Sequence, residues 1–355
     1  MAAREVTVNF FNNTYLTMRR LGEIVHEGQS ELDAPAEIGS TLPREDPQTG
    51  ELITPQPSVW KTVSNGFAQG TEASADYQIL GIPGTFHMHW NNPFVGSNSY
   101  DESAPNGFSL TRSGGSGDSA VVDWVLSGEF SGTPFFKAPV TWDNFSVYFF
   151  RGNAYMRYTR VPPNLGVDPE YPLPILGNWK GLGEAFPSGV DAVILWPEGL
   201  TPNVPGKQAY FFSGPNYVRY NRDPKNEGVD QGSRPILGNW KGLGEAFPQG
   251  VDAAIAWPQG MAGIQKKVAY FFKGNKYVRY TMEPQNEGVD AGYPRPILHN
   301  WPGLGEAFPQ GIDAAIVWDS ATTYFFRGDK YVKYDNAQDK VVDGPHPIVK
   351  QFNIN

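Results

Sequence analysis

The sequence predicts an all-β chain in two parts, an antiparallel β-sandwich over residues 1–131 and a four-bladed β-propeller over residues 136–355. Three observations predict this fold class: composition, a repeat in the second part, and an uneven distribution of charge. The chain has 40 Gly and 31 Pro among 355 residues, and 14% of residues are aromatic but only 18% charged. Such a composition favours short strands joined by turns over long helices.

The first part has the pattern of an antiparallel sandwich. Residues 5–11 (EVTVNFF) alternate as a half-buried strand, and further strands are expected at 76–82, 85–90, 108–112 and 119–130. Clusters of Gly, Asn, Ser and Pro separate these segments. Residues 28–58 contain five prolines, so we expect a long loop or an insertion there.

The second part is a fourfold repeat. The segment GEAFP occurs at 183–187, 244–248 and 305–309, a spacing of 61 residues each time. The segment YFF occurs four times, followed by Gly and then by Tyr-x-x-Tyr, at 148–158, 210–220, 270–280 and 324–334. A repeat of this length indicates an array of similar supersecondary units.

Each unit of the repeat predicts one propeller blade. In the third copy a strand at 252–257 precedes a hairpin, 268–274 and 276–281, joined by a Gly-Asn turn. The Pro-rich piece 288–297 suits an outer edge strand, and NWKGLGEAFP suits a helix or turn before the next copy. Three or four antiparallel strands per unit, repeated four times, are typical of a propeller. We expect Trp179, Trp240 and Trp301 to pack between blades.

Charge separates the two parts and excludes one class of partner. Residues 1–135 carry 6 Lys/Arg and 16 Asp/Glu, a net −10, whereas residues 136–355 carry 22 and 21, a net +1. Neither value favours nucleic acid as a partner.

The sequence also bears on cellular location and catalysis. There is no Cys, hence no disulfide and no thiolate chemistry. The start MAAREVTVNFF lacks the apolar run of a secretion signal, so we expect a protein made soluble in the cytoplasm that acts outside the cell only by another exit route. No Ser–His–Asp, phosphate-loop or complete metal-ligand spacing appears, which predicts no enzymatic activity.

Residues 136–355 resemble the hemopexin repeat family, whose blades carry Asp-Ala, Tyr-Phe-Phe-x-Gly and Tyr-x-x-Tyr. The resemblance implies a central tunnel lined by backbone carbonyls of the innermost strands, which places Asp191, Asp252 and Asp313 at the tunnel, with Lys137 in the fourth place. We expect no required cofactor, and at most a weakly held calcium, sodium or chloride ion. The disulfide usual between the first and last blades of this family is absent, so closure of the ring must rest on packing.

Residues 3–126 resemble the aegerolysin-type insecticidal crystal proteins of bacteria, through AREV (3–6), SNGFAQGTE (64–72), HWNNPFVGSNSYDE (89–102) and GGSG (114–117). The resemblance implies a jelly-roll-like sandwich that acts at insect gut membranes, commonly with a second toxin protein. Aromatic rings beside amides suit lipid or sugar headgroups, so the candidate membrane-binding residues are Trp90, Asn92, Phe94, Ser97 and Tyr100. The alternative is that residues 93–96 form a tight structural loop with Phe94 in the core.

Together these observations predict an insecticidal or defence toxin. The sandwich would bind and form pores in target-cell membranes, and the propeller would recognise a receptor or partner. The alternative is a non-toxic lectin-like or storage-type binding protein.

Overall fold

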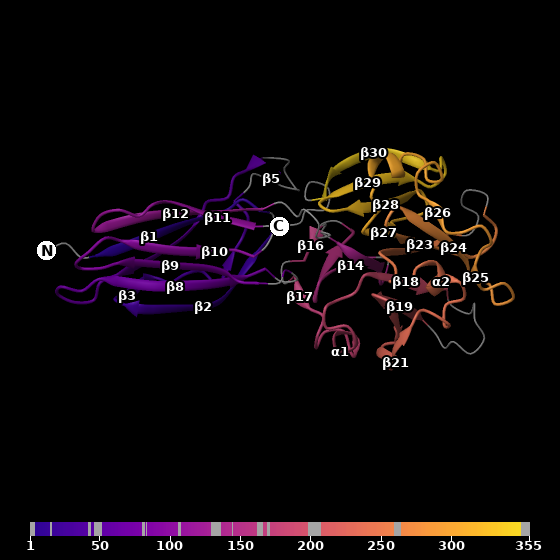
Figure 1. Cartoon of the computed structure of the whole chain (residues 1–355), viewed down its shortest axis with the longest axis horizontal. Coiled ribbons are helices and arrows are strands. Elements are labelled where there is room, and N and C mark those ends of the chain that lie inside the picture. Colours follow the sequence, from indigo (N-terminus) through magenta and orange to yellow (C-terminus); the bar gives the residue numbers. More distant parts are fainter. Residues whose placement is uncertain are drawn as a thin grey trace. The chain divides into compact units, whose positions relative to one another are not determined.

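The computed structural model describes residues 4–14, 16–41, 44–45, 52–79, 82, 84–105, 108–128, 136–143, 145–161, 166–168, 171–197, 207–258 and 264–348. The structure is all-β, with 53% strand and 4% helix. It divides into two compact units, with the change between residues 131 and 132. Both are drawn in Figure 1 and are described separately below. Residues 132–135, between the two predicted parts, lie outside the described residues.

The first unit consists mainly of two five-stranded sheets. One sheet has the order β11 (Phe108–Gly114), β12 (Ser119–Gly128), β1 (Glu5–Asn12), β7 (Ser58–Val63), β3 (Gln29–Leu32). The other has the order β10 (Ser99–Ser103), β9 (Phe86–Asn92), β8 (Thr71–Gln78), β2 (Met18–Glu27), β4 (Glu37–Ile38). Neighbours are antiparallel except β1 and β12, which run parallel.

Tryptophan rings fill the space between these two sheets. Trp60 on β7 and Trp124 on β12 belong to one sheet, and Trp90 on β9 belongs to the other. All three are fully buried, and the Trp90 ring centroid lies 6.2 Å from that of Trp60 and 6.1 Å from that of Trp124. Strict alternation of buried and half-buried residues along β1 and β9 turns one face of each strand toward this core.

The structure adds strands to those expected from the sequence. The predicted strands appear with shifted ends, but β2, β7 and β10 were not anticipated. The Pro-rich segment 28–58, expected to be a long loop or an insertion, contains β3, β4 and the two-residue pair β5 (Arg44–Glu45) and β6 (Leu52–Ile53). Strand β2 was not predicted because its sequence lacks a period of two. Buried and exposed residues do not alternate strictly along this strand.

The second unit consists of four successive antiparallel sheets, or blades. The innermost strands are β13 (Lys137–Thr141), β18 (Ala192–Trp196), β22 (Ala253–Trp257) and β27 (Ala314–Val317). Each is followed by a hairpin: β14 (Ser146–Arg151) with β15 (Ala154–Thr159), β19 (Gln208–Ser213) with β20 (Asn216–Asn221), β23 (Val268–Lys273) with β24 (Lys276–Thr281), and β28 (Thr322–Arg327) with β29 (Lys330–Asp335).

The outer edges of the blades differ in pairs. Blades 1 and 3 end in two short strands each, β16 (Gly166–Val167) with β17 (Leu173–Pro174), and β25 (Gly288–Val289) with β26 (Arg295–Pro296). Blades 2 and 4 end in one longer strand, β21 (Gly228–Pro235) and β30 (Lys340–Pro347). One-turn helices follow the first three blades: α1 (Leu182–Ala185), α2 (Leu243–Ala246) and α3 (Leu304–Ala307). Within the described residues, none of these helices has the length and apolar character needed to cross a membrane.

The repeated tryptophans pack between blades, as expected. Trp179 is 4% exposed. Its ring centroid lies 5.1 Å from Phe150 and 5.5 Å from Tyr155 in blade 1, and 5.7 Å from Phe211 and 5.6 Å from Tyr220 in blade 2. Trp240 and Trp301 make the corresponding contacts in the next two junctions.

One close approach explains the Gly that follows each GEAFP segment. Gly189 has φ of +98°, and a Cβ there would lie 1.8 Å from the carbonyl oxygen of Gly152. Only glycine permits this contact between the chain and the preceding hairpin turn, and the same geometry recurs at Gly250 and Gly311.

The ring closes without a covalent bond. Arg160, just after β15 of blade 1, donates a hydrogen bond to the carbonyl of Trp318 in blade 4, and its guanidinium carbon lies 4.6 Å from the centre of that tryptophan ring. Phe136 also contacts Phe326 of blade 4, with ring centroids 5.7 Å apart. These contacts join the first and last blades of a chain that has no cysteine.

Candidate functional site

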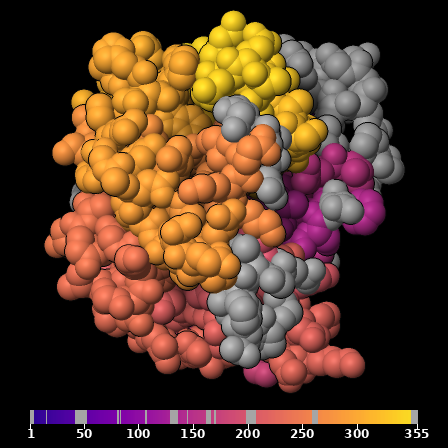
Figure 2. Space-filling model, turned by 90° about the vertical axis from the view of Figure 1, so that its right-hand side faces the viewer, coloured from indigo at the N-terminus to yellow at the C-terminus, as the bar shows by residue number. Residues whose placement is uncertain are grey.

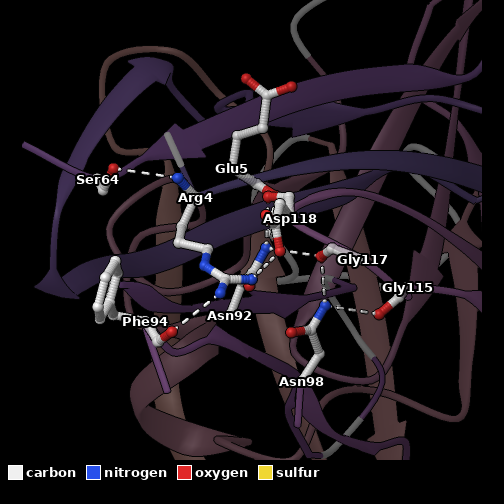
Figure 3. Close-up of polar contacts among 9 residues, drawn as sticks. All are labelled: Arg4, Glu5, Ser64, Asn92, Phe94, Asn98, Gly115, Gly117 and Asp118. Atoms are coloured by element: carbon white, nitrogen blue, oxygen red, sulfur yellow. Dashed lines mark hydrogen bonds and ion pairs between the residues drawn. The ribbon is translucent and has the colours of Figure 1, made fainter. Parts of the chain in front are cut away.

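The loop of residues 93–98, which holds two of the five predicted site residues, is tied to Arg4 and to the segment 115–118 (Figure 3). The Asn98 amide donates to the carbonyls of Gly115 and Gly117, both at 3.0 Å. Arg4 pairs with Asp118 and donates to the carbonyl of Phe94 at 2.9 Å. The loop is therefore held by polar contacts at both ends.

Two of the five candidate membrane residues are fully buried. The Trp90 indole N–H donates to the Thr62 hydroxyl at 2.8 Å in the core. The Asn92 amide nitrogen donates to the carbonyls of Glu5 (3.0 Å), Gly117 (3.2 Å) and Asp118 (2.9 Å). Neither side chain reaches a lipid surface in this fold, so the expectation that they anchor the protein to a membrane needs correction.

The other three candidates differ in exposure. Phe94 and Tyr100 are half-buried, and Ser97 is exposed. The Tyr100 hydroxyl donates to Gly115 at 2.8 Å, and burial raises the pKa of this hydroxyl. Arg4 lies 5.9 Å from the centre of the Phe94 ring. Phe94 thus lies at the edge of the core, and the large apolar group that the loop exposes is Val95, at 83%.

The three propeller aspartates direct their side chains to the hairpins of their own blades. One carboxylate oxygen of Asp191, Asp252 and Asp313 accepts the backbone N–H of Gly214 (2.8 Å), Gly274 (2.8 Å) and Gly328 (2.7 Å), respectively. The other oxygen pairs with a cation in every case. Each aspartate therefore joins the start of an innermost strand to a hairpin turn.

The source of the cation distinguishes blade 2. Asp252 pairs with Lys273 at 2.6 Å and Asp313 with Arg327 at 2.7 Å, each within its own blade. The corresponding residue of blade 2 is Ser213, and Asp191 pairs instead with Lys137 of blade 1 at 2.5 Å. The Lys137 ammonium, expected in the fourth place at the tunnel, is thus paired with a carboxylate of the next blade.

The tunnel contains a cavity of about 110 Å³, lined by the middle residues of the four innermost strands. The lining residues are mostly Val, Ile, Leu and Ala, and the three aspartates lie outside this lining. Among the described residues, no group of three or more His, Cys, Asp or Glu could hold a metal ion. An ion here would depend on backbone oxygen atoms, which are ligands that calcium and sodium accept.

A further cluster, which the sequence reasoning missed, lies on the outer part of the blades. The second variable residue of the Tyr-x-x-Tyr motif is Arg in blades 1 to 3, and it pairs with an Asp of the edge segment: Arg157 with Asp168, Arg219 with Asp230, and Arg279 with Asp290. Blade 4 places Lys333 opposite Asp343. The repeated Tyr-x-Arg-Tyr followed by Gly-Val-Asp was the available signal.

Tyrosines complete this outer cluster. Tyr148, Tyr210 and Tyr270 lie in the adjacent strand, opposite Arg157, Arg219 and Arg279 in the register. Burial raises the pKa of each of these hydroxyls, so they remain protonated hydrogen-bond donors at neutral pH. The arginines are more accessible, with 43% of the Arg157 side chain and 38% of the Arg279 side chain exposed.

Comparison with known proteins identifies the repeats of the second unit. The Hemopexin family model matches residues 136–184, 251–306 and 312–354. Interstitial collagenase of Equus caballus is 28% identical over 204 residues, which cover 55% of this chain and 34% of the relative. Macrophage metalloelastase of Oryctolagus cuniculus is 35% identical over 95 residues, which cover 27% of this chain and 18% of the relative. The chain thus spans about a third or less of these relatives. The second unit carries a hemopexin repeat domain.

Several solved structures similar to the chain come from plants. A plant albumin from Cicer arietinum showing hemagglutination has a TM-score of 0.47 and 18% identity, and covers 62% of this chain and 96% of its own. A plant lectin with two metal binding sites from Cicer arietinum has a TM-score of 0.46 and 21% identity, with 62% and 95% covered. The hemopexin fold protein CP4 from cow pea has a TM-score of 0.44 and 22% identity, with 62% and 96% covered.

The expectation of an insecticidal or defence toxin is wrong. Similar solved structures include plant albumins, a plant lectin and a hemopexin fold protein, and none of these five is described as a toxin. The family model match does not extend into residues 1–131, and the resemblance of that part to aegerolysins is left without support.

Proposed function

We propose that this chain, whose second unit carries a hemopexin repeat domain, is a non-catalytic, lectin-like binding protein. The observation that supports this function is the cluster of Arg, Asp and Tyr on the outer part of the blades. The motifs of the blade interior are used in packing, whereas the outer arginines are fixed by carboxylates and still partly exposed.

Such a cluster has the chemistry of sugar recognition. A guanidinium held by a carboxylate presents planar N–H donors, and the carboxylate presents acceptors, so that adjacent hydroxyl groups can be bound in pairs. A tyrosine ring offers an apolar body with a polar tip. The pyranose ring of a sugar has the complementary surface, an apolar C–H face bordered by hydroxyl groups.

The test is glycan binding by the whole chain. We expect the purified protein to bind a subset of an array of neutral glycans, and free sugar of the same type to inhibit this binding. Absence of binding across the array would contradict the lectin-like function and leave the storage-type alternative, in which accumulation does not depend on ligand recognition.

For residues 1–131 we propose an aegerolysin-like sandwich that folds as a separate domain. The two five-stranded sheets and the compact division of the chain support this proposal. Fragments 1–131 and 135–355 should each give a cooperative thermal transition when expressed alone. If neither does, the units depend on each other for folding.

A further inference from the structure

The four outer clusters fall into two kinds that alternate around the ring. Three positions after the paired Asp, blades 1 and 3 have Tyr171 and Tyr293, whereas blades 2 and 4 have Ser233 and His346. In blades 1 and 3 the edge segment is also longer, with Pro174 and Pro296 six positions after Asp168 and Asp290; the corresponding spacing is five in blade 2 and four in blade 4. The longer segment breaks the edge into two short strands.

The added tyrosine has the same surroundings in both blades. The Tyr171 ring lies 5.4 Å from that of Tyr155, and the Tyr293 ring lies 5.4 Å from that of Tyr277. The guanidinium carbon of Arg157 is 5.5 Å from the Tyr171 ring centre, and that of Arg279 is 5.7 Å from the Tyr293 ring centre.

The carboxylates are also placed alike. Thr159 donates to Asp168 at 2.8 Å, and Thr281 donates to Asp290 at 2.7 Å. Asn221 and Asp335 replace these threonines in blades 2 and 4. Blades 1 and 3 therefore share one arrangement of Tyr, Arg, Asp and Thr, which the other two blades lack.

The two equivalent clusters lie on opposite sides of the propeller. The innermost strands β13 of blade 1 and β22 of blade 3 each neighbour β18 and β27, so blades 2 and 4 separate them around the ring. In Figure 2 the orange surface of blade 3 lies between the coral surface of blade 2 and the yellow surface of blade 4.

We propose that a single chain binds two pyranose residues, one at Tyr171–Arg157–Asp168 and one at Tyr293–Arg279–Asp290, and thereby crosslinks two glycans. The inference rests on the lectin-like function proposed above, and it specifies the number of sugar sites and the residues that form them. The partly exposed tyrosine ring meets the C–H face of the sugar, and the Arg–Asp pair binds adjacent hydroxyl groups. Two sites on opposite sides of the propeller favour bridging between particles over chelation of one glycan.

One difference between the two sites lies directly beside the tyrosine ring. Arg295 of blade 3 lies with its guanidinium carbon 4.7 Å from the Tyr293 ring centre, at the place where blade 1 has Leu173. A sugar at Tyr293 must displace this exposed arginine. Blade 1 consequently forms the tighter site.

The experiment is calorimetry of the whole chain with methyl glycosides of galactose, mannose and N-acetylglucosamine, together with red-cell agglutination. We expect two sugars bound per chain. Tyr171→Ala and Tyr293→Ala should each reduce this number to one and abolish agglutination, and the double variant should bind no sugar. Ser233→Ala, at the same position of blade 2, is the matched control and should retain both properties.

Folding and valence are separated by further measurements. The melting temperature of each variant is compared with that of the parent, and Tyr171→Phe, which keeps the ring, should retain two sites. One sugar per chain in the parent protein, or agglutination by both single alanine variants, would overturn the bivalence and leave the lectin-like function standing. A parent protein that binds no glycoside and no glycan array would overturn both.

Discussion

The loop of residues 93–98 and the outer edge of blade 1 are built from similar residues, aromatic rings beside amide, guanidinium or carboxylate groups. At the loop, the polar groups turn inward: Asn98 donates to two backbone carbonyls, and Asn92, which ends β9 directly before the loop, is fully buried and donates to three. At the blade edge, Arg157 is held by Asp168 but leaves 43% of its side chain exposed. The difference teaches that residue types alone do not mark a binding surface. What matters is whether the polar groups have already been used by the fold.

Removal of the Trp90 ring should cause the largest loss of stability among the substitutions considered. Trp90→Ala deletes a fully buried ring that contacts both Trp60 and Trp124, and such substitutions cost about 3–5 kcal/mol. We expect the thermal transition of the first unit to fall by many degrees while that of the propeller is retained. Calorimetry of the whole chain measures both transitions. An unchanged first transition would mean that Trp90 is not a core residue.

A substitution of Asn92 tests whether the stability of the first unit depends on the buried amide of this residue. Asn92→Leu keeps a similar volume but leaves the carbonyls of Glu5, Gly117 and Asp118 without this donor, at a cost of about 2–3 kcal/mol. Urea unfolding of fragment 1–131 gives the free energy of unfolding. Asn98→Ala is the control, since its contacts to Gly115 and Gly117 are only partly buried and its loss should cost less. Equal costs would contradict the importance given to burial.

Arg160 tests closure of the ring. Arg160→Ala removes a hydrogen bond to the Trp318 carbonyl and a cation–π contact between the first and last blades, worth together about 1–2 kcal/mol. Arg222→Ala is the matched control, because Arg222 makes the same two contacts with Trp142 between blades 1 and 2, which the chain already connects. Limited proteolysis near blade 4 should increase only in the Arg160 variant. Identical behaviour of both variants would show that the closing junction has no special role.

The smallest expected effect concerns the pH dependence of stability that comes from Asp313. Burial raises the pKa of Asp313 in the folded state above that in the unfolded chain. As pH rises, the Asp313 carboxyl therefore loses its proton at a lower pH in the unfolded chain than in the folded protein. This carboxyl lowers stability above its folded pKa, and the penalty is relieved as pH falls through that value. Asp313→Asn should flatten this part of the acid stability profile by less than about 1 kcal/mol. A steeper profile in the variant would contradict the sign.

Local pattern was sufficient for the repeat and for those strands of the first unit that have one buried face. The hairpin formed by YFF, Gly and Tyr-x-x-Tyr recurs because its two strands are close in sequence and pack in the same way in each blade. The segment GEAFP recurs because it forms the same connection from one blade to the next. The alternation in residues 5–11 and 85–90 likewise predicted β1 and β9, since a strand with one buried face shows a period of two. The edge-adjacent strand β2 has no such alternation, and it was missed.

Only the tertiary structure decided which polar and aromatic groups are available for function. Trp90 is buried because a second sheet covers it, and Asn92 is buried because residues 5 and 117–118, far away in sequence, bring carbonyls to its amide. The Lys137–Asp191 pair crosses two blades, and each Arg–Asp pair of the outer clusters joins residues eleven positions apart on neighbouring strands. Burial and pairing depend on what the rest of the chain places against a residue, and this information is absent from a local pattern.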